Sequence, residues 1–247
     1  MLKKMFKKFV NLNKKISKKL ETLFPTFFGE PRNCYIDQLE YINGIINKNA
    51  VSKILEVGGV DRPILKRSSL YNYYGMDIDD RPTCYDCYDK FLVQSVEDEF
   101  SEKFDLVISM TLLEHVPNNT KAMKAIYAAL NAGGTMVHYV PSKHHFYSII
   151  LRILGHRMQK FLIKHLRPEA AEVTGYPAFF DRCSPREMSE LCKETGFKEI
   201  HIVCYYKATD YFAFFTPLYI LVSIFENLFQ RLKFSYFSCG FIIIAEK

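Results

Sequence analysis

The feature that most constrains the fold is a series of four short apolar runs, each closed by a glycine turn or a polar loop. The four runs cover residues 51–57, 71–78, 104–109 and 135–140. Runs that are apolar throughout, without polar alternation, are typical of strands covered on both faces. Helical patterns at 36–46 and 121–130 accompany them. This order of strands and helices predicts βαβ units and a mostly parallel sheet.

A later helix is recognised by its caps. Ser184 stands at the N-cap position, Pro185 follows it, and Gly196 comes directly after the last turn of the pattern. Two further strand patterns cover 199–205 and 241–245, and two apolar stretches that interrupt the alternation cover 142–182 and 207–233. With 247 residues, the chain is long enough for one sizeable core. We expect an α/β fold with helical insertions.

The first run ends in Gly58 and Gly59, and a glycine turn of this kind is a ligand-binding arrangement. Glycines let the backbone approach a ligand, and a following helix offers free N–H groups. Asp77 ends the next run about 20 residues later, where a carboxylate accepts hydrogen bonds from ribose hydroxyls in dinucleotide-binding folds. The alternative for Asp77 is a helix cap or a turn residue.

Taken in order, these segments resemble a known family. ILEVGG, YGMDID, FDLVIS, LLEHVP and ALNAGGTMVHYVP are similar to successive motifs of class I S-adenosylmethionine-dependent methyltransferases, and SPREMSELCKETGFKEI to the late helix–strand unit of that family. LLEHVP also resembles ubiquinone-pathway O-methyltransferases. The resemblance covers roughly residues 51–140 and 184–203. It implies a Rossmann-like class I fold with a mostly parallel seven-stranded sheet, helices on both faces, and S-adenosylmethionine as cofactor.

The resemblance also implies cofactor-binding roles. Glu56 would order the amino end of the cofactor, Asp77 would bind the ribose and Ile78 would flank the adenine. The residues that match family positions in this way are Glu56, Gly58, Gly59, Asp77, Ile78, Ser95, Val96, Ser109 and Met110.

Two positions depart from the family pattern. The glycines usual after Gly58 are replaced by Val60 and Arg62, so the loop must follow another path, stiffened by Pro63. Ser95 stands where an adenine-contacting Asp is usual. These departures motivate an alternative function, a non-catalytic membrane-associated binding module with a degenerate methyltransferase fold.

Three histidines are candidate catalytic residues. His144 and His145 follow the strand pattern at 135–140, at an edge where ligands bind in open α/β sheets, and one of them is expected to act as general base for a hydroxyl acceptor. The alternatives are a pair in a surface loop, or transfer by positioning alone. His115 follows Glu114 and lines the cofactor pocket in our interpretation. We expect no metal ion there, since hard cations need several oxygen ligands.

Charge is concentrated in the first 24 residues. This arm holds eight lysines and one acid, so it accounts for the formal net charge of +6 and leaves residues 25–247 near neutral. Its apolar residues recur at three- and four-residue steps, which predicts a basic amphipathic helix, with a break near residues 11–13 or a disordered tail as alternatives. A near-neutral body disfavours nucleic acid as a partner, and the arm favours an anionic membrane surface.

The domain organisation expected is an arm at 1–24 and a methyltransferase domain at 25–247. The strongly apolar stretch 211–229 contains Pro217 and Glu226, and we expect a helix packed on the domain or dipping into a membrane interface, without crossing it. The scattered cysteines and lack of a signal-peptide pattern predict a cytoplasmic, peripherally membrane-associated protein. The predicted function is S-adenosylmethionine-dependent methylation of a small or lipid-like acceptor, on oxygen, at a membrane surface.

Overall fold

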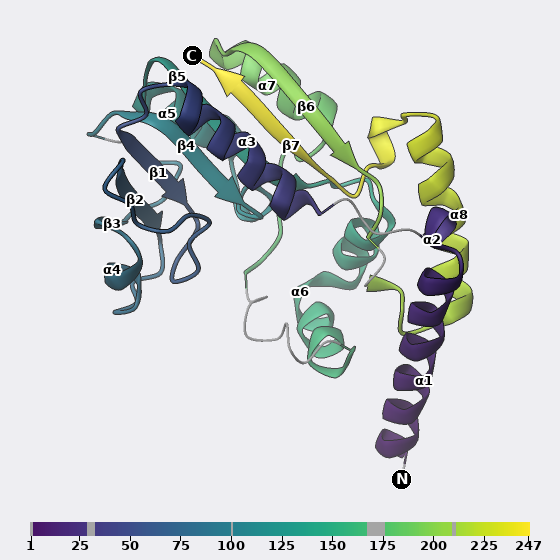
Figure 1. Ribbon diagram of the computed structural model, residues 1–247. Helices are drawn as coiled ribbons and strands as arrows, with labels where there is room; N and C mark the ends of the chain where they lie inside the picture. Colours follow the sequence, from purple (N-terminus) through teal and green to yellow (C-terminus); the bar gives the residue numbers. More distant parts are fainter. Residues whose placement is uncertain (1, 29–32, 100, 167–175, 209–210) are drawn as a thin grey trace. The chain divides into compact units, whose positions relative to one another are not determined.

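The computed structural model describes residues 2–28, 33–99, 101–166, 176–208 and 211–247 (Figure 1). The chain forms two compact units. The sheet unit consists of Cys34–Pro141, Phe179–Val203 and Phe241–Lys247, and the helical unit of Met1–Asn33, Ser142–Ala178 and Cys204–Gly240. Each unit is described by itself.

The sheet has seven strands in the order β3-β2-β1-β4-β5-β7-β6. The strands are β1 (Lys53–Val57), β2 (Asn72–Asp77), β3 (Lys90–Val93), β4 (Phe104–Met110), β5 (Leu130–Pro141), β6 (Lys198–Tyr205) and β7 (Gly240–Glu246). The pairs from β3 to β5 are parallel. β7 runs antiparallel to β5, because Lys247 pairs with Gly134 at one end and Cys239 with Ser142 at the other. The predicted mostly parallel sheet is confirmed.

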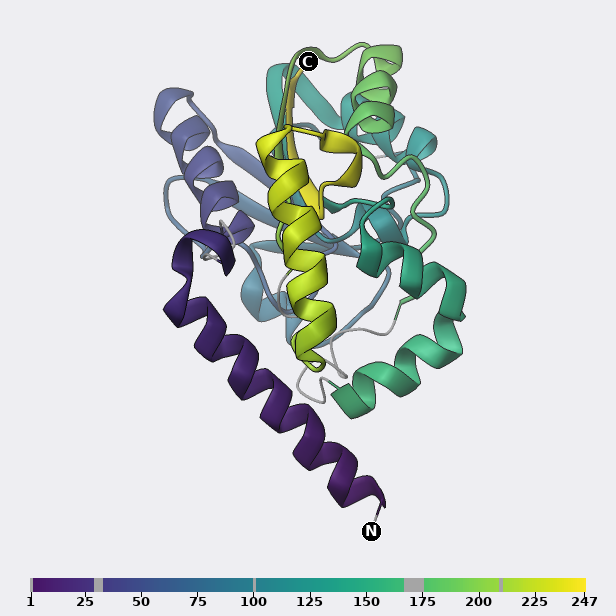
Figure 2. The same ribbon diagram turned by 90° about the vertical axis from the view of Figure 1, so that its right-hand side faces the viewer.

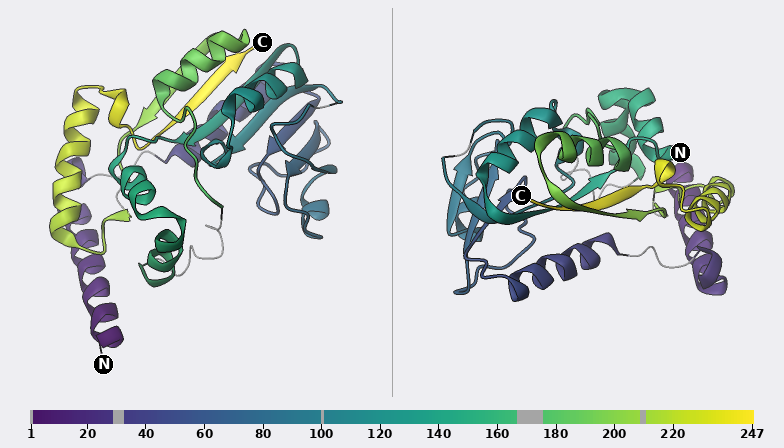
Figure 3. Two further views of the ribbon diagram at one scale, coloured as in Figure 1. Left: turned by 180° about the vertical axis from the view of Figure 1, so that it is seen from behind. Right: turned by 90° about the horizontal axis from the view of Figure 1, so that it is seen from above.

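Helices cover both faces of this sheet, as predicted. They are α3 (Cys34–Lys48), α5 (Asn119–Ala129) and α7 (Pro185–Thr195), with the short α4 (Cys84–Cys87) and the 3-10 turn η1 (Leu113–His115). Figure 3 shows α3 on one face and α5 with α7 on the other. The central strands are buried on both sides: Ile54, Leu55, Leu106, Val107 and Ile108 are inaccessible to solvent. Their continuous apolar runs reflect this double burial.

The cap pattern at α7 is confirmed. The Ser184 hydroxyl accepts a hydrogen bond from the Glu187 N–H, and Pro185 opens the helix, where its missing N–H leaves no carbonyl unpaired. Gly196 ends the helix in the left-handed region at φ 108°. An alanine in that conformation is strained, so the glycine sets the end of α7.

The helical unit contains α1 (Leu2–Leu23), α2 (Pro25–Phe28), α6 (Phe146–Leu166), α8 (Thr216–Arg231) and the 3-10 turn η4 (Ser235–Phe237). α1 is continuous, without the break expected near residues 11–13, because Asn13 turns its amide inward to the Phe9 carbonyl and to α8. α6 bends at Gly155, where φ is 68° (Figure 2). Among the described residues, no helix combines the length and apolarity that a bilayer crossing requires.

Candidate cofactor site

The site lies where the strand order reverses. From β1 the chain moves outward to β2 and β3 and then returns to β4 on the other side of β1. Ligands bind at the carboxyl ends of the strands at such a switch point. Gly58 and Gly59 follow β1 there, Asp77 ends β2, and Ser109 and Met110 end β4.

Both glycines are required by their surroundings. Gly58 has φ 82°, and a Cβ atom there would come within 2.7 Å of the Leu112 side chain. A Cβ atom on Gly59 would overlap the Glu56 carboxyl and the Tyr88 hydroxyl. Both positions thus lack a side chain because Leu112, Glu56 and Tyr88 already occupy the space that it would need, and the loop is packed closely against them.

The Glu56 carboxyl faces inward and holds the loop. It is 1% exposed, accepts a hydrogen bond from the Ile64 N–H at 2.9 Å, and contacts the Tyr73 hydroxyl. Burial raises its pKa to about 7, although both hydrogen bonds oppose the rise. Glu56 thus connects the end of β1 to the far end of the glycine loop, and ordering of the cofactor through that loop stays a proposal.

Tyr88 is a site residue that the sequence analysis missed. Its ring lies against Gly75 in the middle of β2, where an added Cβ atom would approach the ring to 2.5 Å. The ring also packs on Tyr73, with centroids 5.0 Å apart. A glycine inside a strand signals that another group approaches closely, and Gly75 was the available clue.

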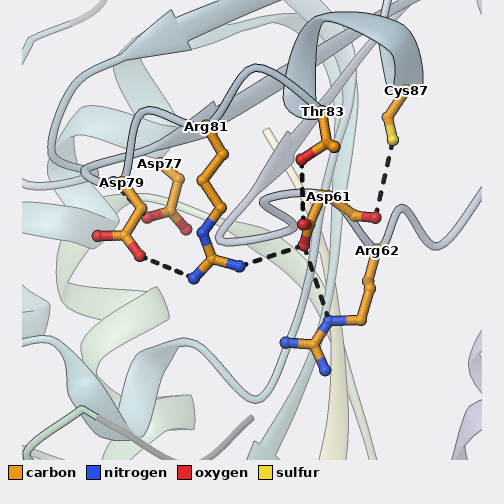
Figure 4. A network of polar contacts seen from close by, with 7 residues as sticks. All are labelled: Asp61, Arg62, Asp77, Asp79, Arg81, Thr83 and Cys87. Atoms are coloured by element: carbon orange, nitrogen blue, oxygen red, sulfur yellow. Dashed lines mark hydrogen bonds and ion pairs between the residues drawn. The ribbon is translucent and has the colours of Figure 1, made fainter. Parts of the chain in front are cut away.

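The glycine loop is tied to the segment that follows β2 through a polar network (Figure 4). Asp61 accepts a hydrogen bond from the Thr83 hydroxyl at 3.1 Å and pairs with Arg81 at 3.4 Å. The same guanidinium reaches Asp79 at 3.1 Å. Val60 precedes the network at φ 47°, a strained value for a β-branched residue. The loop lacks two family glycines, and these contacts fix its alternative path.

Asp77 is held at the edge of the site. Its Oδ1 accepts a hydrogen bond from the Asp79 N–H at 2.9 Å, and its carbonyl accepts one from the Gln94 N–H at 3.0 Å. Burial raises its pKa. Ile78, the proposed adenine neighbour, is 64% exposed. An exposed isoleucine beside a partly buried carboxylate fits a ribose and an adenine ring.

The segment after β3 carries Ser95 and Val96. The Ser95 hydroxyl accepts from the Glu97 N–H at 3.2 Å, which forms a tight turn, and Val96 is buried. The Gln94 hydrogen bond places this turn next to Asp77. The structure therefore brings two of the predicted adenine and ribose segments together.

Ser109 turns its side chain away from the strand end. Its hydroxyl lies 2.6 Å from His138 Nδ1, and its carbonyl accepts from Gln38 Nε2 at 2.8 Å. Both Ser109 and His138 are inaccessible, and burial lowers the pKa of His138 to about 3, so the imidazole is neutral. Met110, the last residue of β4, is half-buried.

A family model described as a methyltransferase domain matches residues 11–202. The chain belongs to this methyltransferase family. This membership confirms the predicted enzyme class, with S-adenosylmethionine as its cofactor, at the level of the domain. The residues at the switch point fit the cofactor: a glycine turn follows β1, and a partly buried carboxylate stands at the end of β2.

Solved structures show the same fold. Phosphoethanolamine N-methyltransferase 2 of Haemonchus contortus, in complex with S-adenosylmethionine, matches at TM-score 0.53 and 13% identity, over 95% of this chain and 57% of its own. An S-adenosylmethionine-dependent methyltransferase of Archaeoglobus fulgidus matches at TM-score 0.53 and 12% identity, over 92% and 98%. This methyltransferase thus spans little more than half of the Haemonchus enzyme. No curated protein matches it in sequence.

Glu114 is a buried acid near the end of β4 in the methyltransferase. It is 5% exposed, its Oε2 has no hydrogen-bond partner, and His115 Nε2 lies 3.6 Å from its Oε1. Burial raises the pKa of Glu114 to about 8. Within the described residues, no group of three or more His, Cys, Asp or Glu side chains is placed to hold a metal ion.

Glu114 makes the stability of the methyltransferase depend on pH. Because its pKa rises from 4.5 to about 8 on folding, its contribution is fully present below pH 4.5 and is lost as pH rises through about 8. The free energy of unfolding of Glu114→Gln is therefore expected to exceed that of wild type by about 5 kcal/mol at alkaline pH and to match it under acidic conditions. Thermal unfolding across pH measures this. An equal dependence of stability on pH in both proteins would contradict this prediction. In Glu114→Gln a smaller pH dependence of the same sign is expected to remain, because burial also raises the pKa of Glu56.

Two of the three predicted catalytic histidines, His144 and His145, lie in the helical unit. His145 is 1% exposed, and its Nε2 lies 3.2 Å from Oε1 of Glu226, which also accepts from the Ala208 N–H at 3.0 Å. His144 is half-buried and stacks on Tyr236 at 3.9 Å between ring centroids. His145 thus joins the start of α6 to α8, and the general-base role stays a hypothesis for both.

We expect His145→Ala to destabilise the methyltransferase by about 3 kcal/mol, because removal of one partner leaves the buried Glu226 carboxyl without its imidazole. Chemical denaturation measures the change in the free energy of unfolding. His144→Ala is the matched control, and it should lower the free energy of unfolding by well under half of the decrease expected for His145→Ala. Turnover lowered about 10²–10⁴-fold in His144→Ala, at unchanged stability, would support His144 as the general base. A His145→Ala variant as stable as wild type would contradict the structural role.

Proposed function

We propose that the protein transfers the methyl group of S-adenosylmethionine to an oxygen of a small or lipid-like acceptor at a membrane surface. The observation that carries the transfer reaction is the arrangement at the switch point: the glycine turn at Gly58 and Gly59 follows β1, and the partly buried Asp77 ends the neighbouring β2. Sulfonium and acceptor held in line react through proximity, so the chain needs chiefly to bind and orient them.

The acceptor class is argued from the helical unit. α8 leaves apolar side chains exposed, among them Leu221 and Ile224 at 51% and 47%. Exposed apolar residues on neighbouring turns of one helix mark a surface for an apolar partner. An enzyme with such a surface meets a lipid-like acceptor where that acceptor is concentrated.

A labelling experiment tests this function. The purified protein, methyl-labelled S-adenosylmethionine and a membrane extract are incubated together, and the organic and aqueous phases are counted. We expect label in the organic phase and a product whose mass spectrum places the methyl group on oxygen. Label in the aqueous phase would indicate a small polar acceptor, and methyl on nitrogen would contradict the oxygen assignment. Cofactor binding without transfer to any extract would favour the binding module.

A further inference from the structure

The buried face of α1 combines Val10 with polar side chains. Asn13 and Ser17 are buried, and the Thr216 N–H donates to Asn13 Oδ1 at 2.9 Å. The Tyr219 hydroxyl donates to Glu21 at 2.9 Å. In a surface helix of a globular protein the apolar stripe normally faces inward. Here polar contacts hold α1 beside α8 (Figure 2).

Most of the apolar side chains described in α1 nevertheless remain exposed. The apolar sector of α1 comprises Met5, Phe6, Phe9, Leu12, Ile16 and Leu23, which are between 42% and 59% exposed. At about 100° per residue, these positions fall on one side of the helix. A second sector of exposed lysines adjoins it: Lys4, Lys7, Lys8, Lys15, Lys18 and Lys19. An exposed apolar stripe beside a basic stripe is the pattern of an interfacial helix.

α8 also leaves an apolar stripe exposed, although Tyr219 and Val222 are buried. Ser223 and Glu226 are buried, whereas Leu221, Ile224, Phe225 and Leu228 form a stripe that is between 39% and 51% exposed. The rings of Phe9 and Phe215, both exposed, lie 6.2 Å apart. This ring pair connects the apolar sector of α1 to the beginning of α8.

We propose that the apolar sector of α1, its lysines and the exposed stripe of α8 form a docking surface for an anionic lipid bilayer. The helices lie in the interface plane, with apolar side chains among the acyl chains and lysines at the headgroups. The lysines favour a bilayer over a second copy of the chain as the partner. Self-association would bring two sets of lysines together, and these would repel each other, whereas anionic headgroups would attract the lysines of α1. The docking surface itself is argued from α1 and α8 alone. Its purpose, to bring the enzyme to a lipid-like acceptor, rests on the proposed function.

Vesicle sedimentation of the full chain tests the surface. The vesicles are phosphatidylcholine alone or mixed with phosphatidylserine. Phe9→Ser/Leu12→Ser is expected to bind mixed vesicles about tenfold more weakly at any salt concentration. In Lys15→Gln/Lys19→Gln, the affinity for mixed vesicles should fall about fivefold per lysine at low salt and by less at high salt. Leu70→Ser, at a residue 75% exposed in the sheet unit, and Lys121→Gln/Lys124→Gln on α5 are the matched controls and should bind as wild type does.

Each outcome is decisive. Wild-type protein that ignores mixed vesicles, or α1 variants that bind like the controls, would overturn the proposal. So would concentration-dependent dimerisation that Phe9→Ser/Leu12→Ser abolishes, because the occupant would then be a second copy. Circular dichroism verifies that each variant is folded. A cofactor titration in parallel distinguishes failure of the docking surface from failure of the proposed methyltransferase function. Vesicle binding without cofactor binding would reject the function and support the docking surface.

Discussion

Gly59→Ala is expected to abolish measurable S-adenosylmethionine binding and to destabilise the protein by about 3 kcal/mol or more. The added methyl group would overlap the Glu56 carboxyl and the Tyr88 hydroxyl, both of which are buried and have no room to withdraw. Either the loop moves, which breaks the Ile64 hydrogen bond to Glu56, or the Tyr88 ring leaves Gly75. Isothermal titration calorimetry and thermal unfolding measure the two effects.

The matched control for this prediction is Gly44→Ala in α3. No atom lies within 4 Å of a Cβ atom added there, and alanine is favoured over glycine inside a helix by about 1 kcal/mol. Gly44→Ala should therefore be as stable as wild type or slightly more so, with unchanged cofactor affinity. The double variant Gly59→Ala/Tyr88→Phe is expected to regain part of the stability, because one of the two overlaps is removed. Wild-type behaviour of Gly59→Ala would refute the close packing of this loop.

Asp77→Ala is expected to weaken S-adenosylmethionine binding at least 10²-fold, since two hydrogen bonds from ribose hydroxyls to a carboxylate contribute about 1.5 kcal/mol each or more. Calorimetric titration measures the affinity. Asp80→Ala is the control, because Asp80 is an exposed carboxylate three positions further on and accepts only from the Tyr85 hydroxyl at 3.1 Å. Equal affinities for Asp77→Ala and wild type would remove Asp77 from the ribose site. Since burial raises the pKa of Asp77, affinity should also decline earlier on acidification than an exposed aspartate would cause.

The sequence predicted the parts of the fold that repeat a simple physical pattern. The central strands are apolar because both faces are covered, and α7 carries its caps in the sequence itself. β3 was missed because Lys90–Val93 contains only a three-residue apolar run, which is too short to distinguish a strand from a loop; within it only Phe91 is buried. The same limit applies to α4, a single turn.

Side-chain contacts between segments far apart in the chain could not be predicted from the sequence pattern. Nothing in the spacing of Asp61 and Arg81 indicates that they pair, because the pairing depends on the path of a loop without its usual glycines. Likewise the pattern of α1 predicted an amphipathic helix but not which side would pack. The buried pair of Asn13 and Thr216 settles that choice, and both residues look like ordinary polar surface positions in the sequence.

The place of β7 has a consequence for the order in which the protein folds. β7 is the last strand along the chain, yet it lies between β5 and β6, and β6 has no other neighbour in the sheet. During synthesis the strands from β1 to β5 can associate early, but β6 has no strand to join until residues 240–246 emerge. Until β7 is present, β5 is therefore the open edge of the nascent sheet, and the backbone N–H and C=O groups that β7 later pairs are accessible to chaperones.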